Sequence, residues 1–337
     1  MVAAERTVRT NMRMRASTLL AGLGILALLC VTVAISFGSG PVGPRAILSL
    51  AAGGGDELSR QVLLTLRMPR ALAAFGTGAA LALAGALMQV LLRNPLADPY
   101  ILGTSGGAAA FALAAMLGGF GGAVVDVSAF TGALASTLLV FMLARGGQWA
   151  AGRLLLTGVV VAAGWSALVS LMLALSPERN LRGALFWLMG DFAFAGNPAG
   201  CLLIALLATG CCLVLGRALN VLATGDQQAA LLGLPVRGMR IAIYLLSALL
   251  TSTAVVTAGT VGFVGLVVPH LVRLAAGADH RVVVPGAALA GGALLVTADL
   301  VARTVLAPRQ LPVGAITALV GVPLFLLLLI RGRPAVE

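Results

Sequence analysis

Hydrophobic runs separated by short polar breaks follow one another along almost the whole chain. Several of these runs reach about 18 residues with almost no charge, which is the length that a helix needs to cross a bilayer. The pattern predicts an all-α, polytopic membrane protein with a single transmembrane domain over residues 1–337. The ten expected spans are 17–37, 68–92, 100–118, 122–144, 154–175, 198–216, 241–258, 262–275, 284–302 and 312–330.

The first and the eighth of the expected spans are unusual. The first follows an arginine-rich start, as a signal peptide does, but 17–37 is long for such a segment. We therefore interpret it as a retained span behind a cytoplasmic N-terminal tail, residues 1–16. The eighth span, 262–275, is short and contains Gly265 and Pro269, so we expect a broken or partial helix there.

The composition supports this class and excludes others. The chain is 60% hydrophobic and 10% charged, whereas a soluble domain carries about 25% charge. All 22 basic residues are arginine. Because a Walker A loop needs its lysine, this chain is not itself a P-loop ATPase. No basic patch on a soluble fold is apparent, so we expect no nucleic acid partner.

The arginines also indicate the orientation. With a cytoplasmic N-terminus, fourteen arginines fall on the cytoplasmic side and eight on the other. This agrees with the positive-inside rule, and an even number of spans places both termini in the cytoplasm. Cys30, Cys201, Cys211 and Cys212 lie within apolar runs without a CxxC spacing, which favours packing over a disulfide or a zinc site.

Small residues are frequent inside the expected spans. Closely packed helices are predicted by Gly76, Gly78, Gly85 and the pair 291–292, because small residues let helix backbones approach in lipid.

Charged residues are scarce inside the expected spans. Asp299 is the nearest to a mid-span charge, and it falls at the outer end of its span. This argues against an ion- or proton-coupled carrier, which remains the alternative function, and against a membrane-embedded enzyme.

A polar segment at 217–240 interrupts the second half of the chain. Inside it, 226–232 reads as a short helix whose start Thr224 or Asp226 can cap and which Gly233 can end in a left-handed conformation.

The short helix offers a candidate docking surface. Ala229 and Leu232 are three residues apart and should share one apolar face. We hypothesise that this face docks into another protein; an amphipathic linker on the lipid headgroups is the alternative.

Eight motifs in a fixed order carry a resemblance to a known family. The motifs are RMPR, GALMQ, RNPLADPYILG, GDQQAALLGLPV, GFVGLVVPHLVR, GADHR, ADLVAR and LPVG. They cover about residues 60–331. With these motifs the chain resembles the permease family of type II ABC importers, which are ATP-driven and take iron–siderophore chelates, haem or vitamin B12 from a binding protein.

The resemblance implies a set of partners. It implies a homodimer or pseudo-dimer in the bacterial inner membrane, two ATP-binding subunits inside and a periplasmic binding protein outside. ATP and Mg²⁺ would be held by the partner subunits, so this chain would bind no cofactor or metal and would have no catalytic residue. The cargo stays open among siderophore, haem and cobalamin.

The resemblance also assigns roles to residues. Arg67 and Arg303 would dock the binding protein at the outer mouth, and Asn94 and Leu96 would form a cytoplasmic gate. A partner gate at 150–152 departs from the polar pattern of the family. The residues that would enter a groove of the ATP-binding subunit are Asp226, Gln227, Gln228, Ala229, Leu232 and Gly233.

Several further side chains have a plainer interpretation. For His270 and His280 we favour a helix-end role over ligation of haem. Trp165 and Trp187 are expected in the core or in an interfacial belt rather than along a translocation path. For Arg182, a solvated surface and a contact with an anionic chelate or the binding protein are equally favoured.

Overall fold

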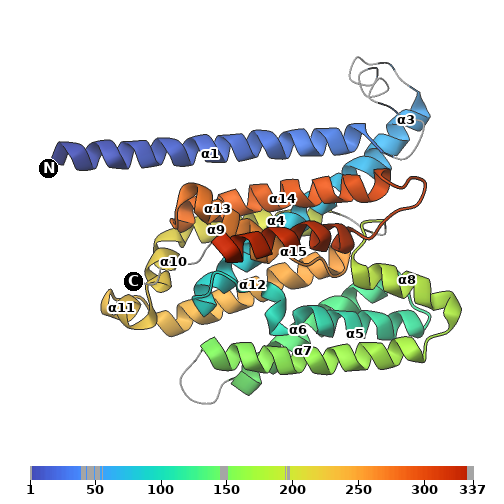
Figure 1. Ribbon diagram of the computed structural model, residues 1–337. Coiled ribbons are helices and arrows are strands. Elements are labelled where there is room, and N and C mark those ends of the chain that lie inside the picture. The colour runs from blue at the N-terminus through green and yellow to red at the C-terminus, as the bar shows by residue number, and fades with distance from the viewer. Residues whose placement is uncertain are drawn as a thin grey trace.

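The computed structural model describes residues 2–38, 56–144, 151–193 and 198–331, together with the single positions 43, 49, 54 and 195. Within these ranges all regular structure is helical (Figure 1). The all-α prediction is confirmed.

The helices have the following bounds. They are α1 (Val2–Ser36), α3 (Glu57–Gln61), η1 (Val62–Arg67), α4 (Met68–Leu92), η2 (Pro99–Leu102), α5 (Thr104–Leu117), α6 (Ala123–Ala144), α7 (Ala151–Ala174), α8 (Glu178–Met189), α9 (Ala199–Val214), α10 (Gly216–Ala223), α11 (Asp226–Leu231), α12 (Val236–Ala258), α13 (Val264–Ala276), α14 (His280–Thr304) and α15 (Val313–Arg331).

Each of the ten expected spans coincides with an apolar helix, but not all of these helices have full length. Among the described residues, six helices are long and apolar enough to cross a membrane, and α9 with α10, bent by 68°, makes a seventh. The apolar helices α5, α13 and α15 are shorter. The expected partial helix at 262–275 is α13, which contains Pro269.

Two helices begin earlier than expected. Helix α1 starts at Val2, so residues 2–16 are helical as well, although the apolar span within this helix begins only at Arg15. The second span does not begin at Met68, because a continuous helix runs from Glu57 to Leu92. Pro69 lies just after the π-helical segment η1. A π-helical turn lets a helix pass a proline whose ring and missing N–H would otherwise break it.

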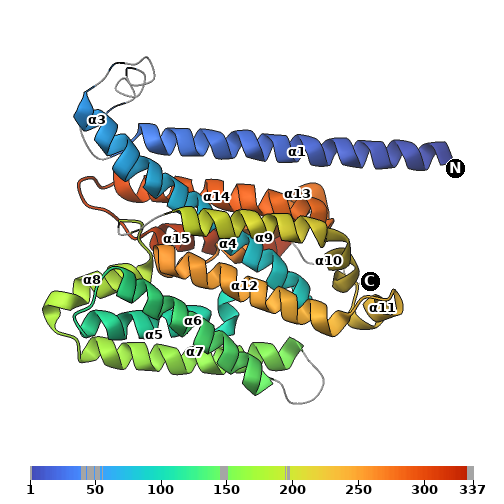
Figure 2. The same cartoon turned by 180° about the vertical axis from the view of Figure 1, so that it is seen from behind.

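The bundle has two distinct ends. The start of α1, the helices α10 and α11 and the C-terminal end of α15 lie together at one end, which we call the α11 end (Figures 1 and 2). Helices α3 and α8 lie at the other, which we call the α8 end. Helix α8 was not expected from the hydrophobic pattern, which showed only a polar stretch followed by FWLMG at this place.

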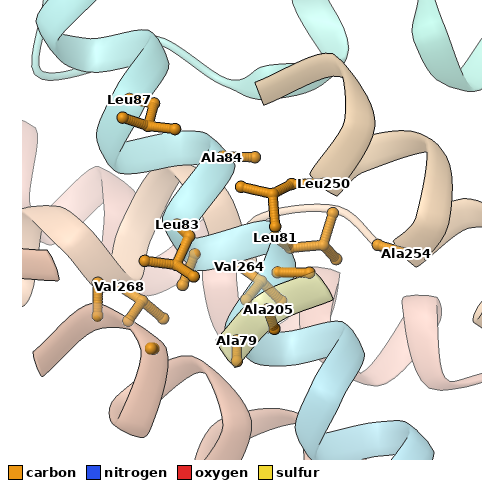
Figure 3. Packing of buried hydrophobic residues seen from close by; sticks show 14 of the residues in the cluster. Ala79, Leu81, Leu83, Ala84, Leu87, Ala205, Leu250, Ala254, Val264 and Val268 are labelled. Atoms are coloured by element: carbon orange, nitrogen blue, oxygen red, sulfur yellow. The ribbon is translucent and has the colours of Figure 1, made fainter. Parts of the chain in front are cut away.

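Helix α4 is the centre of the bundle. It packs against α9, α12, α13 and α14, and most of its side chains are buried. Figure 3 shows Leu81 and Leu83 of α4 among Leu250 of α12 and Val264 of α13. The outer helices instead expose large apolar side chains, as surfaces in lipid do.

The predicted close approach through small residues is confirmed along α4. A Cβ atom on Gly78 would collide with the carbonyl oxygen of Gly291 in α14. A Cβ atom on Gly85 would collide with the carbonyl oxygen of Gly265 in α13. Because these backbones touch, α4 holds the neighbouring helices α13 and α14 at fixed positions against it.

Candidate functional site: a protruding helix and a buried arginine cluster

The short helix α11 forms where the sequence indicated, but its start differs from the expectation. Its N-cap is Gly225, with φ of 123° and no side-chain cap, so neither Thr224 nor Asp226 caps it. The Thr224 hydroxyl instead donates to the Val221 carbonyl at the end of α10. The end is as predicted, because Gly233 has φ of 81° and its N–H bonds to the Ala230 carbonyl.

The exposed face of α11 also differs from the expectation. Ala229 is fully buried, whereas Leu232 is 71% exposed, so the two do not share a face. The helix ends at Leu231, and Leu232 is its non-helical C-cap, so the three-residue spacing rule fails there. The apolar pair on the surface is Leu231, at 88% exposed, with Leu232. We call the exposed residues Gln227, Gln228, Ala230, Leu231 and Leu232 the α11 knob.

Asp226 lies at the base of the knob and is bound within its own chain. Its Oδ2 accepts from Arg240 Nη1 at 2.6 Å and lies 3.8 Å from Arg93 Nη2. The role of Asp226 in a partner's groove stays a prediction, but its carboxylate already has two arginine partners here. These contacts join the knob to the start of α12 and the end of α4.

The predicted gate residues Asn94 and Leu96 lie in the turn after α4, at the α11 end. Arg93 ends α4 in the left-handed conformation, with φ of 49°. The Asn94 side-chain oxygen then accepts from the Leu96 N–H at 2.9 Å and so closes the turn. Leu96 is 38% exposed. The gate role stays a prediction; Ala150, from the expected second gate, lies outside the described residues.

A second polar link joins α10 to α14 at the same end. The Asn220 side-chain oxygen accepts from the backbone N–H of His280 at 2.8 Å. The ring Nδ1 of His280 lies 2.7 Å from the same oxygen. Asn220 also donates to Asp279, the N-cap of α14, at 2.8 Å. His280 therefore lies at the start of α14, but the residue that caps this helix is Asp279 and not His280.

A buried ionic cluster lies at the α8 end. Arg70 of α4 donates to both carboxylate oxygens of Asp299 in α14, at 2.8–3.1 Å. It also donates to Gln310 at 3.2 Å and lies 3.6 Å from Asp191. The side chain of Asp299 is only 1% exposed. This acidic residue of α14 is therefore neutralised by an arginine fork.

The predicted docking residues Arg67 and Arg303 lie beside this cluster, and both are buried at 5% exposed. Arg67 donates to the carbonyls of Ile35 and Ser36, each at 3.2 Å, and Arg303 donates to that of Ala34. The last carbonyls of a helix lack partners within it. Both arginines therefore cap α1 from buried positions, and the docking role that the resemblance implies stays a prediction.

These arginines still face a common space. A cavity of about 300 Å³ is lined by Arg67, Arg70 and Arg303 together with Gln310. Three guanidinium groups line this cavity, and two carboxylates lie beside them: Asp299, which pairs with Arg70 and lies 3.6 Å from Arg303, and Asp191. The arginines therefore outnumber the acids around this cavity.

Trp165 and Trp187 make packing contacts, and Trp187 also lines a cavity of about 520 Å³. Trp165 of α7 donates to the hydroxyl of Ser136 in α6 at 2.8 Å and packs edge-on against Phe111. Trp187 packs against a small cluster of buried residues from α5, α6 and α12. Arg182 lies 6.0 Å from the ring of Phe186, its neighbour on α8.

Some of the residues in these arrangements were not found from the sequence. Arg70 and Arg93 were noted only within motifs and as topology markers, and neither Arg240 nor Asp191 was given a role. The sequence did hold part of the signal for Arg70. A single acidic residue in a nearly charge-free span needs a positively charged partner, which indicates that an arginine lies close to Asp299. Nothing in the sequence connects Arg240 with Asp226, which lie fourteen residues apart on either side of a turn.

The fold and the site together define the class: a polytopic helical membrane protein with an apolar knob at one end and buried arginines at the other. The chain belongs to the FecCD transport family, whose model matches residues 26–331. It is therefore a permease subunit of an ABC importer and not an enzyme.

Individual relatives agree with this. The chain is 40% identical over 324 residues to the hemin transport system permease protein HmuU of Yersinia pestis, covering 92% of this chain and 96% of that one. It is 38% identical over 323 residues to the vitamin B12 import system permease protein BtuC of Citrobacter koseri, covering 93% and 94%. A solved structure described as an inward-facing, metal-chelate type ABC transporter matches with a TM-score of 0.82 and 32% identity, over 94% of this chain and 99% of the other.

Proposed function

We propose that this chain is the membrane subunit of an ATP-driven importer that moves an iron chelate, a siderophore complex or haem, or else cobalamin, into the cytoplasm. A dimer of ATP-binding subunits would bind at the α11 end, which would face the cytoplasm with both termini. A periplasmic binding protein would bind at the α8 end. A second copy of this permease would complete the translocation path in the inner membrane.

The observation that carries the proposal is the α11 knob. Leu231 and Leu232 are 88% and 71% exposed at the tip of a six-residue helix, between two glutamines and Gly233. A compact apolar pair with a polar surround is typical of a surface that enters a groove on another protein. A linker lying on headgroups would expose a longer apolar stripe than this one.

The arginine-lined cavity supports the binding-protein side of the proposal. It lies at the opposite end from the knob, and its guanidinium groups from Arg67, Arg70 and Arg303 would attract acidic side chains. Because Arg67 and Arg303 already bond to the end of α1, docking there would exchange carbonyl partners for carboxylates.

The experiment tests partners and energy source together. The chain is tagged and co-expressed with an ATP-binding subunit and a binding protein from the same organism, and the purified complex is placed in liposomes. We expect the ATP-binding subunit to co-purify, and uptake of haem, a ferric siderophore or cobalamin to require ATP on the side of the α11 knob. Uptake by this chain alone under a proton or sodium gradient would contradict the proposal and favour the ion-coupled alternative.

A further inference from the structure

We propose that Arg240 is a positioning residue that joins α11 to the end of α4, so that a displacement of α11 moves the turn containing Asn94 and Leu96. This inference rests on the proposed function, because it takes the α11 knob as the point where an ATP-binding subunit acts and the turn as a gate.

The Arg240 guanidinium touches both segments at once. The residue lies in the second turn of α12 and is 4% exposed. Its Nη1 donates to Asp226, the first residue of α11, at 2.6 Å. Its Nη2 donates to the carbonyl of Leu91, in the last turn of α4, at 3.4 Å. One rigid, planar group therefore joins α11 to α4 through α12.

Arg93 closes the same arrangement from the other side. Its Nη2 lies 3.8 Å from the carboxylate oxygen that Arg240 binds. Its Nη1 lies 3.4 Å from the position that a Cβ atom on Gly225 would occupy. Arg93 is also the residue at which α4 ends and the turn containing Asn94 and Leu96 begins. Asp226 is therefore held between two arginines, one before the turn and one on α12.

The choice of an arginine here is not explained by packing. Removing a guanidinium from water is costly, and an apolar side chain of similar volume often stabilises a protein more than a buried ion pair does. What the arginine adds is a fork of donors that can bind a carboxylate and a helix-end carbonyl together. Both of its acceptors lie on segments that the proposed mechanism requires to move together.

The turn after α4 is built to follow the end of the helix. The Asn94 N–H bonds back to the Gln89 carbonyl at 3.2 Å, and the Ala97 N–H bonds to the Asn94 carbonyl at 3.1 Å. With the side-chain bond from Asn94 to Leu96, these contacts make the turn a continuation of α4. A shift of Leu91 and Arg93 would therefore carry Asn94 and Leu96 with it.

The test compares Arg240→Gln with wild type in the reconstituted complex of permease, ATP-binding subunits and binding protein. Glutamine keeps a polar side chain but loses the charge and the fork. We expect ATP hydrolysis within about twofold of wild type but about tenfold less cargo moved per ATP, in the range of measured coupling effects between sites. Arg281→Gln, which removes an exposed arginine at the same end, is the matched control and should keep the wild-type ratio.

Hydrogen exchange distinguishes coupling from simple destabilisation. In wild type, trapping the ATP-bound state should change exchange at both 226–232 and 93–97. In Arg240→Gln the change at 226–232 should persist while the change at 93–97 disappears. A merely structural role would raise exchange in both segments in every state.

Two results with Arg240→Gln would overturn the inference. They are an unchanged ratio of cargo moved to ATP hydrolysed and a change in hydrogen exchange at 93–97 that persists in the variant.

If Arg240→Gln fails to assemble, the variant Asp226→Asn tests the inference instead, because it leaves Arg240 in place and keeps an acceptor oxygen. It should lower the ratio about threefold or more, and an unchanged ratio would overturn the inference. Failure of the wild-type chain to bind any ATP-binding subunit would instead refute the proposed function.

Discussion

This protein contains arginine but no lysine, and the buried arginines use a geometry that lysine lacks. Arg70 binds both oxygens of Asp299 and also reaches Gln310, while Arg240 binds a carboxylate and a carbonyl. A lysine ammonium group is a point charge and cannot present two parallel donors to one carboxylate. Arg67 and Arg303 use the same donors to cap α1.

Asp98 should make the stability of the protein depend on pH. It lies in the turn after α4, where its carboxylate accepts from the Tyr100 N–H at 2.8 Å. Burial raises the pKa of Asp98 from 3.8 to about 6. Because the folded state holds this proton more tightly than the unfolded state, stability falls as pH rises from about 4 to about 6, and the loss remains above 6.

The variant Asp98→Asn keeps an acceptor oxygen for Tyr100 but cannot ionise. We expect its apparent Tm in detergent to exceed that of wild type at pH 7.5 and to match it near pH 4. The measurement is thermal unfolding of both proteins across this pH range. A difference in Tm that is the same at both pH values would show that ionisation of Asp98 is not its cause.

At the scale of elements, α11 combines a firmly held base with an exposed tip. Ala229 is buried and Asp226 is bound by two arginines, whereas Leu231 and Leu232 face outward. A helix of six residues is too short to be stable alone in water. Its conformation therefore depends on contacts with α4, α10 and α12, and a force on its tip is transmitted to those helices.

Changing Leu232 to Asp should prevent the knob from entering an apolar groove. An ionised carboxylate there would have to lose its hydration without gaining a partner, which is unfavourable by several kcal/mol. We expect uptake to fall at least about tenfold, with loss of the ATP-binding subunit on purification. Leu232→Met, which keeps an apolar side chain of similar size, is the control. Normal uptake by Leu232→Asp in a well-folded protein would contradict docking at the knob.

At the scale of the molecule, the two ends of the bundle differ in chemistry. The knob and the turn containing Asn94 and Leu96 lie at the α11 end, and the arginine-lined cavity lies at the α8 end, with α4 running between them (Figures 1 and 2). Glycine contacts fix α4 against α13 and α14, so a movement of α4 relative to them requires those backbone contacts to slide.

Labelling at engineered cysteines tests which end faces the cytoplasm. In a background with the four native cysteines changed to alanine, Gln227→Cys at the α11 end should react with a membrane-impermeant maleimide only from the cytoplasmic side. Arg309→Cys, exposed in the connection between α14 and α15, should react only from outside. Inside-out and right-side-out vesicles give the comparison. The reverse labelling pattern would invert the orientation that the arginine distribution predicts.

The sequence by itself determined the helical class, the number and order of the apolar segments and the close approach of α4 to its neighbours. It could do so because these properties depend on local hydrophobicity and on small residues along one helix. It also placed α11 and its glycine end, since a helix stop is a local signal. The family followed from motifs, each of which is likewise contiguous in the chain.

Only the tertiary structure decided which charges meet. Arg70 and Asp299 are 229 positions apart, and Arg240 and Leu91 are 149 apart. The face of α11 that stays exposed was likewise decided by what packs on Ala229, not by spacing along the chain. Burial of Arg67 and Arg303 depends on where α1 ends beside α4 and α14. Such pairings depend on how whole helices pack, and no local pattern of residues encodes that arrangement.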